Sequence, residues 1–185
     1  MITVACLSVL LGASLPLKSE LSTTAVAVQR AQPKLVLTIE KRGSVEIELF
    51  QDTAPKTVQH IADLARKGFY DGLQFFRVIK EPRPFLVQIG DPQTRSKSLE
   101  DPALGSGGSG TRVAFEASGH KHVRGAVGLS TLPGDKNSGD SQFYIMLADH
   151  GFLDENYTVF GRVTKGMDVV DSIALGDSVS KATLQ

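Results

Sequence analysis

The residue types that most often carry chemistry are few in this chain, and their spacing matches no catalytic or metal motif. A single cysteine, Cys6, allows neither an internal disulfide nor a cysteine metal cluster. The four histidines show no HExxH spacing, and we interpret them as surface residues: His60, His120, His122 and His150. A serine hydrolase is disfavoured, because the sequence has no GxSxG nucleophile motif.

Two polar loops resemble ion-binding or phosphate-binding segments, but each lacks an essential residue. Residues 135–140 begin like a calcium-binding loop, yet Asp140 occupies the position of the invariant glycine and Met146 that of the bidentate glutamate. The glycine-rich residues 105–110 lack the Lys-Ser/Thr pair of a phosphate-binding loop and do not connect a strand to a helix. We therefore expect neither a metal site nor a phosphate site.

The elements that would position a site are mainly strands. Residues 35–39 and 45–49 are apolar or alternating runs on either side of a Lys-Arg-Gly turn, which predicts a β-hairpin. Further strands are predicted at residues 73–79, 85–89, 125–131, 142–147 and 158–163. The long polar stretch 92–110 is typical of a functional or mobile loop.

Two helices are predicted near opposite ends of the domain. Asp52 or Thr53 can cap the first helix, Pro55 fits its first turn and Gly68 its end. One apolar stripe along it is suited to packing on a sheet and consists of Val58, Ile61, Ala62 and Ala65. A short second helix is predicted over residues 167–175. Many strands with only two helices indicate a closed or sandwiched β-sheet with helical plugs.

Composition and charge indicate one globular domain and disfavour a nucleic-acid partner. The chain has 185 residues, of which 41% are hydrophobic and 22% charged. Lys plus Arg and Asp plus Glu are 20 each, so the chain has no excess of cations to face phosphates.

The N-terminal segment differs from the rest and indicates export. Residues 2–15 form an uncharged apolar run, shorter than the ~20 residues of a membrane helix but typical of a signal-peptide core. The Ala-Val-Ala of residues 25–27 provides a cleavage site. We therefore expect a signal peptide over residues 1–30 and a periplasmic or thylakoid-lumenal location. A cytoplasmic protein that retains this segment as a helix is the alternative.

Several blocks of sequence carry a resemblance to a known family. They are residues 75–79 leading to 85–91, then 121–125, 138–145, 152–154 with 159–163, and 166–170. In their order and spacing these blocks resemble the cyclophilin family of peptidyl-prolyl cis-trans isomerases. The resemblance implies a mainly β fold, an eight-stranded antiparallel closed β-barrel capped by two α-helices. We expect this domain over residues 34–176, followed by a C-terminal tail over residues 177–185.

The resemblance also implies a catalytic pair, Arg77 and Gln88. Rotation about an Xaa-Pro bond breaks amide resonance against a barrier of ~20 kcal/mol. A fixed cation near the amide nitrogen would stabilise the twisted amide, and Arg77 is always charged and rich in donors. In the family, the residue matching Gln88 is the hydrogen-bonding neighbour of that arginine. The chemistry requires no cofactor.

The substrate-binding residues implied by the resemblance form an apolar socket for the proline ring and its surroundings. They are Phe85, Leu86, Leu132, Gln142, Tyr144, Phe152, Leu153 and Tyr157. Gln142 would hold the substrate backbone, and the glycines of residues 105–108 would border the place of the residue two before proline. Packing in the barrel core is the alternative for the apolar members, and a turn-forming role is the alternative for Gln142 and the glycines. The expected partners are proline-containing segments of client proteins, and we expect a monomer.

The chain departs from the best-known family pattern at several positions. Leu86 replaces a methionine, Tyr157 replaces a histidine, and Phe152 replaces the tryptophan whose indole grips cyclosporin, so weak cyclosporin binding is expected. Pro133 has no N–H, which removes one substrate-backbone donor.

Two segments are longer than the family's minimal spacing, residues 80–84 and 92–104, and we expect them to border the groove. The departures leave a second function open, a proline-binding module or chaperone with little turnover.

Overall fold

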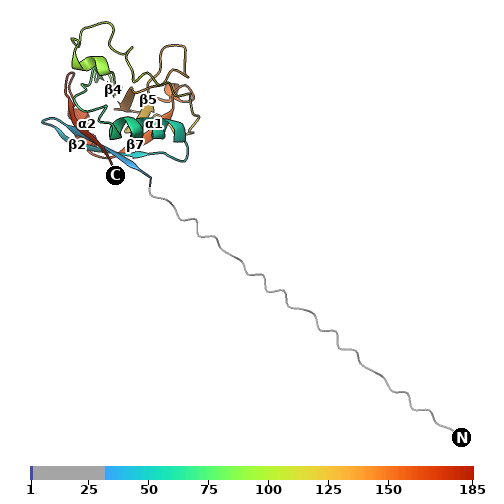
Figure 1. Cartoon of the computed structure of the whole chain (residues 1–185). Coiled ribbons are helices and arrows are strands. Elements are labelled where there is room, and N and C mark those ends of the chain that lie inside the picture. Colours follow the sequence, from blue (N-terminus) through green and yellow to red (C-terminus); the bar gives the residue numbers. More distant parts are fainter. Residues whose placement is uncertain (2–31) are drawn as a thin grey trace. The chain divides into compact units, whose positions relative to one another are not determined.

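The computed structural model describes Met1 and residues 32–185, and the structural description below concerns residues 32–185 (Figure 1). The predicted signal peptide, with its cleavage site, lies outside these residues. No helix within the described part combines the length and apolar character that a membrane crossing requires.

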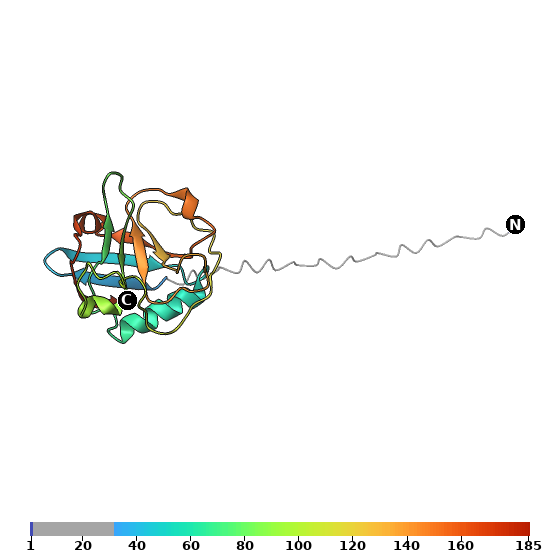
Figure 2. The same cartoon turned by 90° about the horizontal axis from the view of Figure 1, so that it is seen from above.

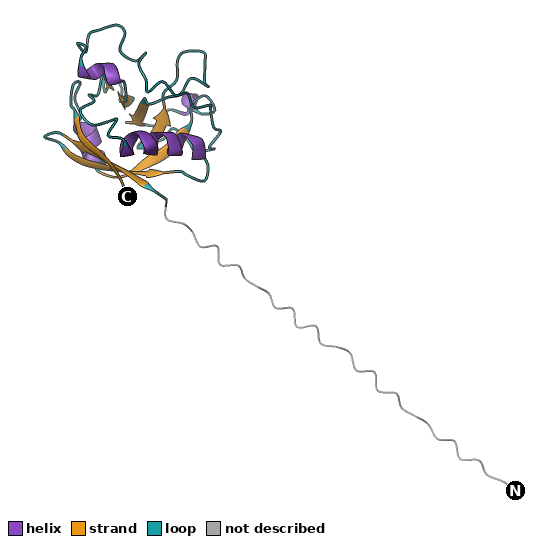
Figure 3. Cartoon of the chain, viewed as in Figure 1, coloured by secondary structure: helices purple, strands orange, loops and turns teal. Residues whose placement is uncertain are grey.

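One antiparallel sheet of eight strands dominates the described chain (Figure 3). Its spatial order is β3-β4-β6-β5-β7-β2-β1-β8. The strands are β1 (Lys34–Ile39), β2 (Gly43–Leu49), β3 (Arg77–Ile79), β4 (Leu86–Ile89), β5 (Ala126–Leu129), β6 (Phe143–Met146), β7 (Val159–Lys165) and β8 (Val179–Leu184). The predicted hairpin is confirmed as β1 and β2, and the mainly β architecture with two α-helices is as expected.

The sheet curls but does not close through a strand ladder, so the expected closed barrel is wrong in this detail. Its edge strands are β3 and β8, and only an isolated bridge joins Gln74 to Ser178. The segment before β3 bonds instead to the first residue of β8 and to the residues just before it: the N–H of Gly72 donates to the carbonyl of Val179 at 2.7 Å, and the N–H of Phe75 donates to the carbonyl of Asp177 at 2.9 Å. The predicted strand 73–79 is therefore shortened to β3, because its first half bonds to residues 177–179 without forming a continuous ladder.

The C-terminal segment is part of the fold, which corrects the predicted tail over residues 177–185. Strand β8 pairs antiparallel with β1, with Leu37 opposite Ala182 and Ile39 opposite Val179. Val179 and Ala182 are buried in the core. The prediction failed because polar residues separate these two small apolar ones, and their burial depends on a partner strand far away in the sequence.

Two α-helices pack on different strands of the sheet, and two short 3-10 helices lie in connections between strands (Figure 2). Helix α1 (Pro55–Arg66) buries the predicted stripe and packs on β8. Helix α2 (Met167–Ser172) packs on β2 and ends earlier than predicted, because Ile173 leaves the helical conformation at ψ 131°. The 3-10 helices are η1 (Pro92–Arg95) and η2 (Gly151–Leu153).

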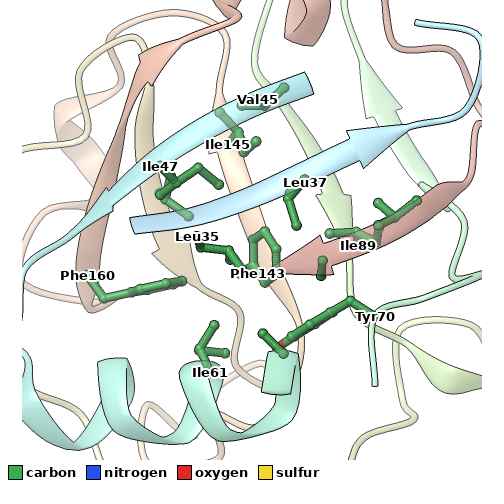
Figure 4. Close-up of a cluster of buried hydrophobic side chains, with 14 of the residues drawn as sticks. Leu35, Leu37, Val45, Ile47, Ile61, Tyr70, Ile89, Phe143, Ile145 and Phe160 are labelled. Carbon is green, nitrogen blue, oxygen red and sulfur yellow. The ribbon is translucent and has the colours of Figure 1, made fainter. Parts of the chain in front are cut away.

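The main core lies inside the curled sheet, where strands from both ends of the chain meet α1 (Figure 4). Leu37, Ile89 and Phe143 are among its fully buried members. Strands β4, β5 and β6 are buried on both faces, and since successive side chains alternate, half of their residues point away from this core. The outward-facing Leu86, Ala126, Tyr144 and Met146 form a second, smaller apolar cluster with Leu153 and Val159.

Candidate active site

Strand register places four residues in one row across four adjacent strands. Arg77 of β3 lies opposite Gln88 of β4, Gln88 lies opposite Tyr144 of β6, and Tyr144 lies opposite Gly128 of β5. Residues directly opposite one another share a face of the sheet. The row therefore presents a cation, an amide and a phenol side by side on the face turned away from the main core.

Arg77 lies at one end of this row and is exposed, whereas its neighbour Gln88 is buried. The guanidinium Nη1 donates to Gln88 Oε1 at 3.4 Å, and Gln88 is only 4% exposed. In the described chain, arginine ion pairs involve other residues and not Arg77. The cation is thus held by a neutral amide and keeps its charge available to a bound molecule.

Gln88 extends the row into a chain of amide hydrogen bonds. Its Nε2 donates to Ser130 Oγ at 3.0 Å and to Gln142 Oε1 at 2.9 Å. Gln142 Nε2 in turn donates to the carbonyl of Gly107 at 2.7 Å. Each amide has both ends engaged, so Arg77 is connected through two fixed side chains to the glycine-rich loop.

A groove of about 450 Å³ opens directly over the row. It is lined by all the predicted site residues except Gln142, namely Arg77, Phe85, Leu86, Gln88, Leu132, Tyr144, Phe152, Leu153 and Tyr157. Gln142 lines an adjoining pocket of about 100 Å³ together with residues 105–108. The structure therefore brings every predicted site residue to one of two neighbouring cavities.

The groove has a buried apolar floor and an exposed aromatic rim. Leu86, Tyr144 and Leu153 form the floor and belong to the second apolar cluster. At the rim, Phe152 is 69% exposed and stacks on Phe85 with ring centroids 5.9 Å apart. A compact apolar ring could enter such a groove, lose its contact with water on the floor and remain covered by the rim.

The adjoining pocket depends on a buried acid that the sequence analysis did not single out. Asp91 is fully buried, and its carboxylate accepts the N–H groups of Gly105 at 2.6 Å and Gly107 at 3.1 Å. A Cβ at Gly107 would lie 2.2 Å from Asp91 Oδ1, so only glycine fits there. The signal available in the sequence was Asp91-Pro92, an acid that can cap a short helix and also anchor a loop.

The prediction of surface histidines is wrong for His122, which is 1% exposed. Its Nδ1 lies 2.9 Å from Asp154 Oδ1, and its Nε2 lies 2.9 Å from Tyr144 Oη. Burial lowers the pKa of His122, and hydrogen bonds from His122 lower the pKa of Asp154 to about 2. Burial also raises the pKa of Tyr144 well above its usual value. Because the partners come from distant segments, no local pattern predicts this cluster.

The other histidines and the two long loops take more varied positions than predicted. His120 is exposed, whereas His60 and His150 are partly buried. Residues 80–84 do not line the groove, although the carbonyl of Pro84 lies 2.9 Å from His150 Nε2. The other long segment reaches the groove through Leu104. In the described part of the chain, no three His, Cys, Asp or Glu side chains are grouped to hold a metal ion.

Comparisons with known proteins agree with this geometry. The family profile "Cyclophilin type peptidyl-prolyl cis-trans isomerase/CLD" matches residues 34–185. A probable peptidyl-prolyl cis-trans isomerase of Brucella suis is 39% identical over 159 residues, covering 78% of this chain and 79% of its own. Peptidyl-prolyl cis-trans isomerase B of Bacillus subtilis is 34% identical over 147 residues, covering 80% of this chain and 94% of its own.

A solved structure shares the fold. It is a cyclophilin type peptidyl-prolyl cis-trans isomerase of Cryptosporidium parvum, determined in the presence of the dipeptide Ala-Pro. It superposes with a TM-score of 0.70 at 21% identity and covers 82% of this chain and 98% of its own.

Proposed function

The chain belongs to the cyclophilin-type peptidyl-prolyl cis-trans isomerases, and we propose that Arg77 is the cation that lowers the barrier to rotation about the Xaa-Pro bond. The observation that carries this assignment is the guanidinium at the mouth of an apolar groove, bonded to a buried glutamine and to no carboxylate among the described residues.

The chemistry requires a donor that meets the amide only when it twists. In the planar amide the nitrogen lone pair is delocalised into the carbonyl, which gives the bond its barrier of ~20 kcal/mol. Twisting localises the lone pair on nitrogen, which then accepts a hydrogen bond. A guanidinium N–H fixed beside that nitrogen stabilises the twisted state more than the planar one, and only such a difference accelerates the step.

The rest of the groove serves to hold the proline while its amide turns. The apolar floor of Leu86, Tyr144 and Leu153 accepts the ring, and the stack of Phe85 and Phe152 covers it. Gln142 has both ends of its amide engaged, so a role in holding the substrate backbone requires the peptide to replace its bond to Gly107.

The test is turnover of a Xaa-Pro peptide by the chain carrying Arg77→Ala. We expect kcat/KM to fall about 100-fold, because a preorganised donor contributes on the order of 3 kcal/mol to such a transition state. Arg77→Lys should recover little, since it keeps the charge but lacks the planar fork. Arg83→Ala is the matched control, because Arg83 is exposed and does not line the groove. Unchanged turnover in Arg77→Ala would refute the assignment.

A binding module with little turnover is the second candidate, and Pro133 favours it. Pro133 lines the groove without an N–H, so the peptide loses one possible backbone partner there. Peptide affinity and turnover measured on the same preparation separate the two functions. An affinity that survives with no acceleration of isomerisation would support the binding module.

The substrates we propose are proline-containing segments of proteins in the periplasm or thylakoid lumen, on the strength of the signal-peptide features in residues 1–30. Mass spectrometry of the mature N-terminus tests this location, and an intact residue 1 would contradict it.

We also propose that the chain is a monomer, which sedimentation measures. Cyclosporin should bind weakly because Phe152 lacks an indole donor, and a low-nanomolar calorimetric Kd would contradict this.

A further inference from the structure

A chain of three hydrogen-bonded side chains begins at the floor of the groove with Tyr144 and continues to two residues that do not line the groove. Tyr144 Oη lies 2.9 Å from His122 Nε2, and His122 Nδ1 lies 2.9 Å from Asp154 Oδ1. Tyr144 is 4% exposed and His122 is 1% exposed. The three come from β6, from the loop before β5 and from the residue after η2.

The other side of the Tyr144 ring is fixed by a glycine. Gly128 is the cross-strand partner of Tyr144, and a Cβ at Gly128 would lie 2.4 Å from Tyr144 Cζ and Oη. The phenol thus occupies the space that any other residue at position 128 would need. Its conformation is set by this space on one side and by the His122 acceptor on the other.

Only one arrangement of protons satisfies the chain near neutral pH. Asp154 is ionised, since its pKa is about 2, and it accepts both the backbone N–H and Nδ1–H of His122. With Nδ1 protonated, the neutral imidazole has a lone pair at Nε2. That lone pair accepts the Tyr144 hydroxyl, whose pKa is raised by burial, so the phenol keeps its proton.

We propose that His122 is a positioning residue for proline isomerisation, held in its Nδ1-protonated tautomer by Asp154 and fixing Tyr144 as the floor of the proline socket. The inference rests on the proposed function, because it concerns how the same groove grips proline. It extends the site by two residues, since neither His122 nor Asp154 lines the groove.

Protonation of His122 would reverse the role of Nε2. An imidazolium donates from both nitrogens, so the Tyr144 hydroxyl would become the acceptor and would have to rotate its own hydrogen away from Nε2. The titratable groups facing His122 are Asp154, the two phenols Tyr144 and Tyr157, and Lys121, whose Nζ pairs with Asp154 Oδ2 at 3.2 Å. The segment of His150 contributes its backbone N–H to the His122 carbonyl. Grip on proline should therefore weaken on acidification, below the ordinary histidine pKa.

A double-mutant cycle tests the positioning role. At pH 7.5 we expect His122→Leu to raise the KM for a Xaa-Pro peptide about tenfold with a smaller change in kcat. We expect Tyr144→Phe to raise KM by no more than His122→Leu does. The double variant should have a KM no higher than that of His122→Leu alone. His122→Gln, which restores an acceptor, should recover part of the loss, and His120→Leu is the control. If His122→Leu raises KM by the same factor in the unmodified chain and in the Tyr144→Phe variant, the proposal is overturned.

A measurement on the unmodified chain keeps the proposal falsifiable if His122→Leu does not fold. Nitrogen-15 NMR of the His122 ring should show the Nδ1-protonated tautomer at pH 7.5, and peptide affinity should fall with the same midpoint as the His122 titration. The Nε2-protonated tautomer, or an affinity independent of that titration, would overturn it. If the expected tautomer and peptide affinity are found but the chain does not accelerate isomerisation, the proposed isomerase function is refuted. The role of His122 in positioning Tyr144 for proline binding would still stand.

Discussion

Strands β4, β5 and β6 separate two apolar regions that differ in kind. On the inner face, Phe143 and Ile145 of β6 join the main core. On the outer face, the intervening Tyr144 and Met146 join the smaller cluster below the groove. Alternate residues of the same strand therefore belong to the two regions, so the inner and outer regions can be compared on one backbone.

The two regions differ in how their polar atoms are satisfied. In the main core the Tyr70 hydroxyl donates to the carbonyl of Ser141 at 3.0 Å, and no side-chain network follows from it. On the outer face, polar side chains bond to one another, from Arg77 through Gln88 to Gln142 and from Tyr144 through His122 to Asp154. The inner region therefore depends mainly on apolar volume, whereas the outer region depends on the placement of individual atoms.

The largest effect on stability is expected from emptying the inner region. Phe160→Ala removes a fully buried ring that packs edge-on against Phe143, and it should lower the free energy of unfolding by about 3–5 kcal/mol. Urea unfolding measures the loss. The kcat/KM of the fraction that remains folded should stay within about threefold of the original. A tenfold fall without unfolding would show that the two regions are not separable.

A smaller loss of stability is expected from overfilling the outer region. Gly128→Ala places a methyl group 2.4 Å from the Tyr144 ring, and overpacking of this kind costs about 1–3 kcal/mol. Because the phenol must move, peptide affinity should fall as well. Gly151→Ala is the control, since its nearest neighbour would lie at 3.8 Å. A Gly128→Ala variant with normal stability and affinity would contradict the fixed position of Tyr144.

Loss of the anchor of the glycine-rich loop should cost about 1.5–3 kcal/mol, the range of hydrogen bonds to a charged group. Asp91→Asn keeps the shape of the side chain, but its NH2 group must face either the N–H groups of Gly105 and Gly107, which share Oδ2, or the N–H of Gln93 at Oδ1. Affinity should fall most for peptides that depend on the residue two before proline, with kcat nearly unchanged. Equal affinities across a peptide series would contradict this role of the loop.

The inner region was more predictable from sequence than the outer one. The alternation in residues 45–49 and the stripe on α1 report burial locally, and both were confirmed. Strand β8 was missed because its two buried residues gain a core only through pairing with β1. Local patterns report which face of an element is apolar, but they do not report which distant element covers it.

The outer region was predicted only where a family motif named its residues. That resemblance supplied Arg77, Gln88 and the groove lining, which the structure gathers at two adjoining cavities. It did not supply Asp91 or His122, whose roles arise from hydrogen bonds to segments far away in the sequence. The sequence does not distinguish a buried histidine from an exposed one, because the difference lies in the hydrogen-bond partners that the fold brings to it.

The smallest effects are expected from pH, and of the two regions only the outer one should lose stability on the acid side through His122 and Asp154. On the outer face the pKa values of His122 and Asp154 are lowered by folding, so the unfolded chain binds protons more readily. Stability should therefore fall as the pH drops below about 6.5, and again from about 4 toward 2. Burial raises the pKa of Tyr70 in the core and that of Tyr144 on the outer face, so both regions should lose stability as the pH rises past about 10. Urea unfolding across this pH range measures the acid and the alkaline losses, and Asp154→Asn should flatten the acid loss between about pH 4 and 2. An acid loss unchanged in that variant would show that other groups dominate it.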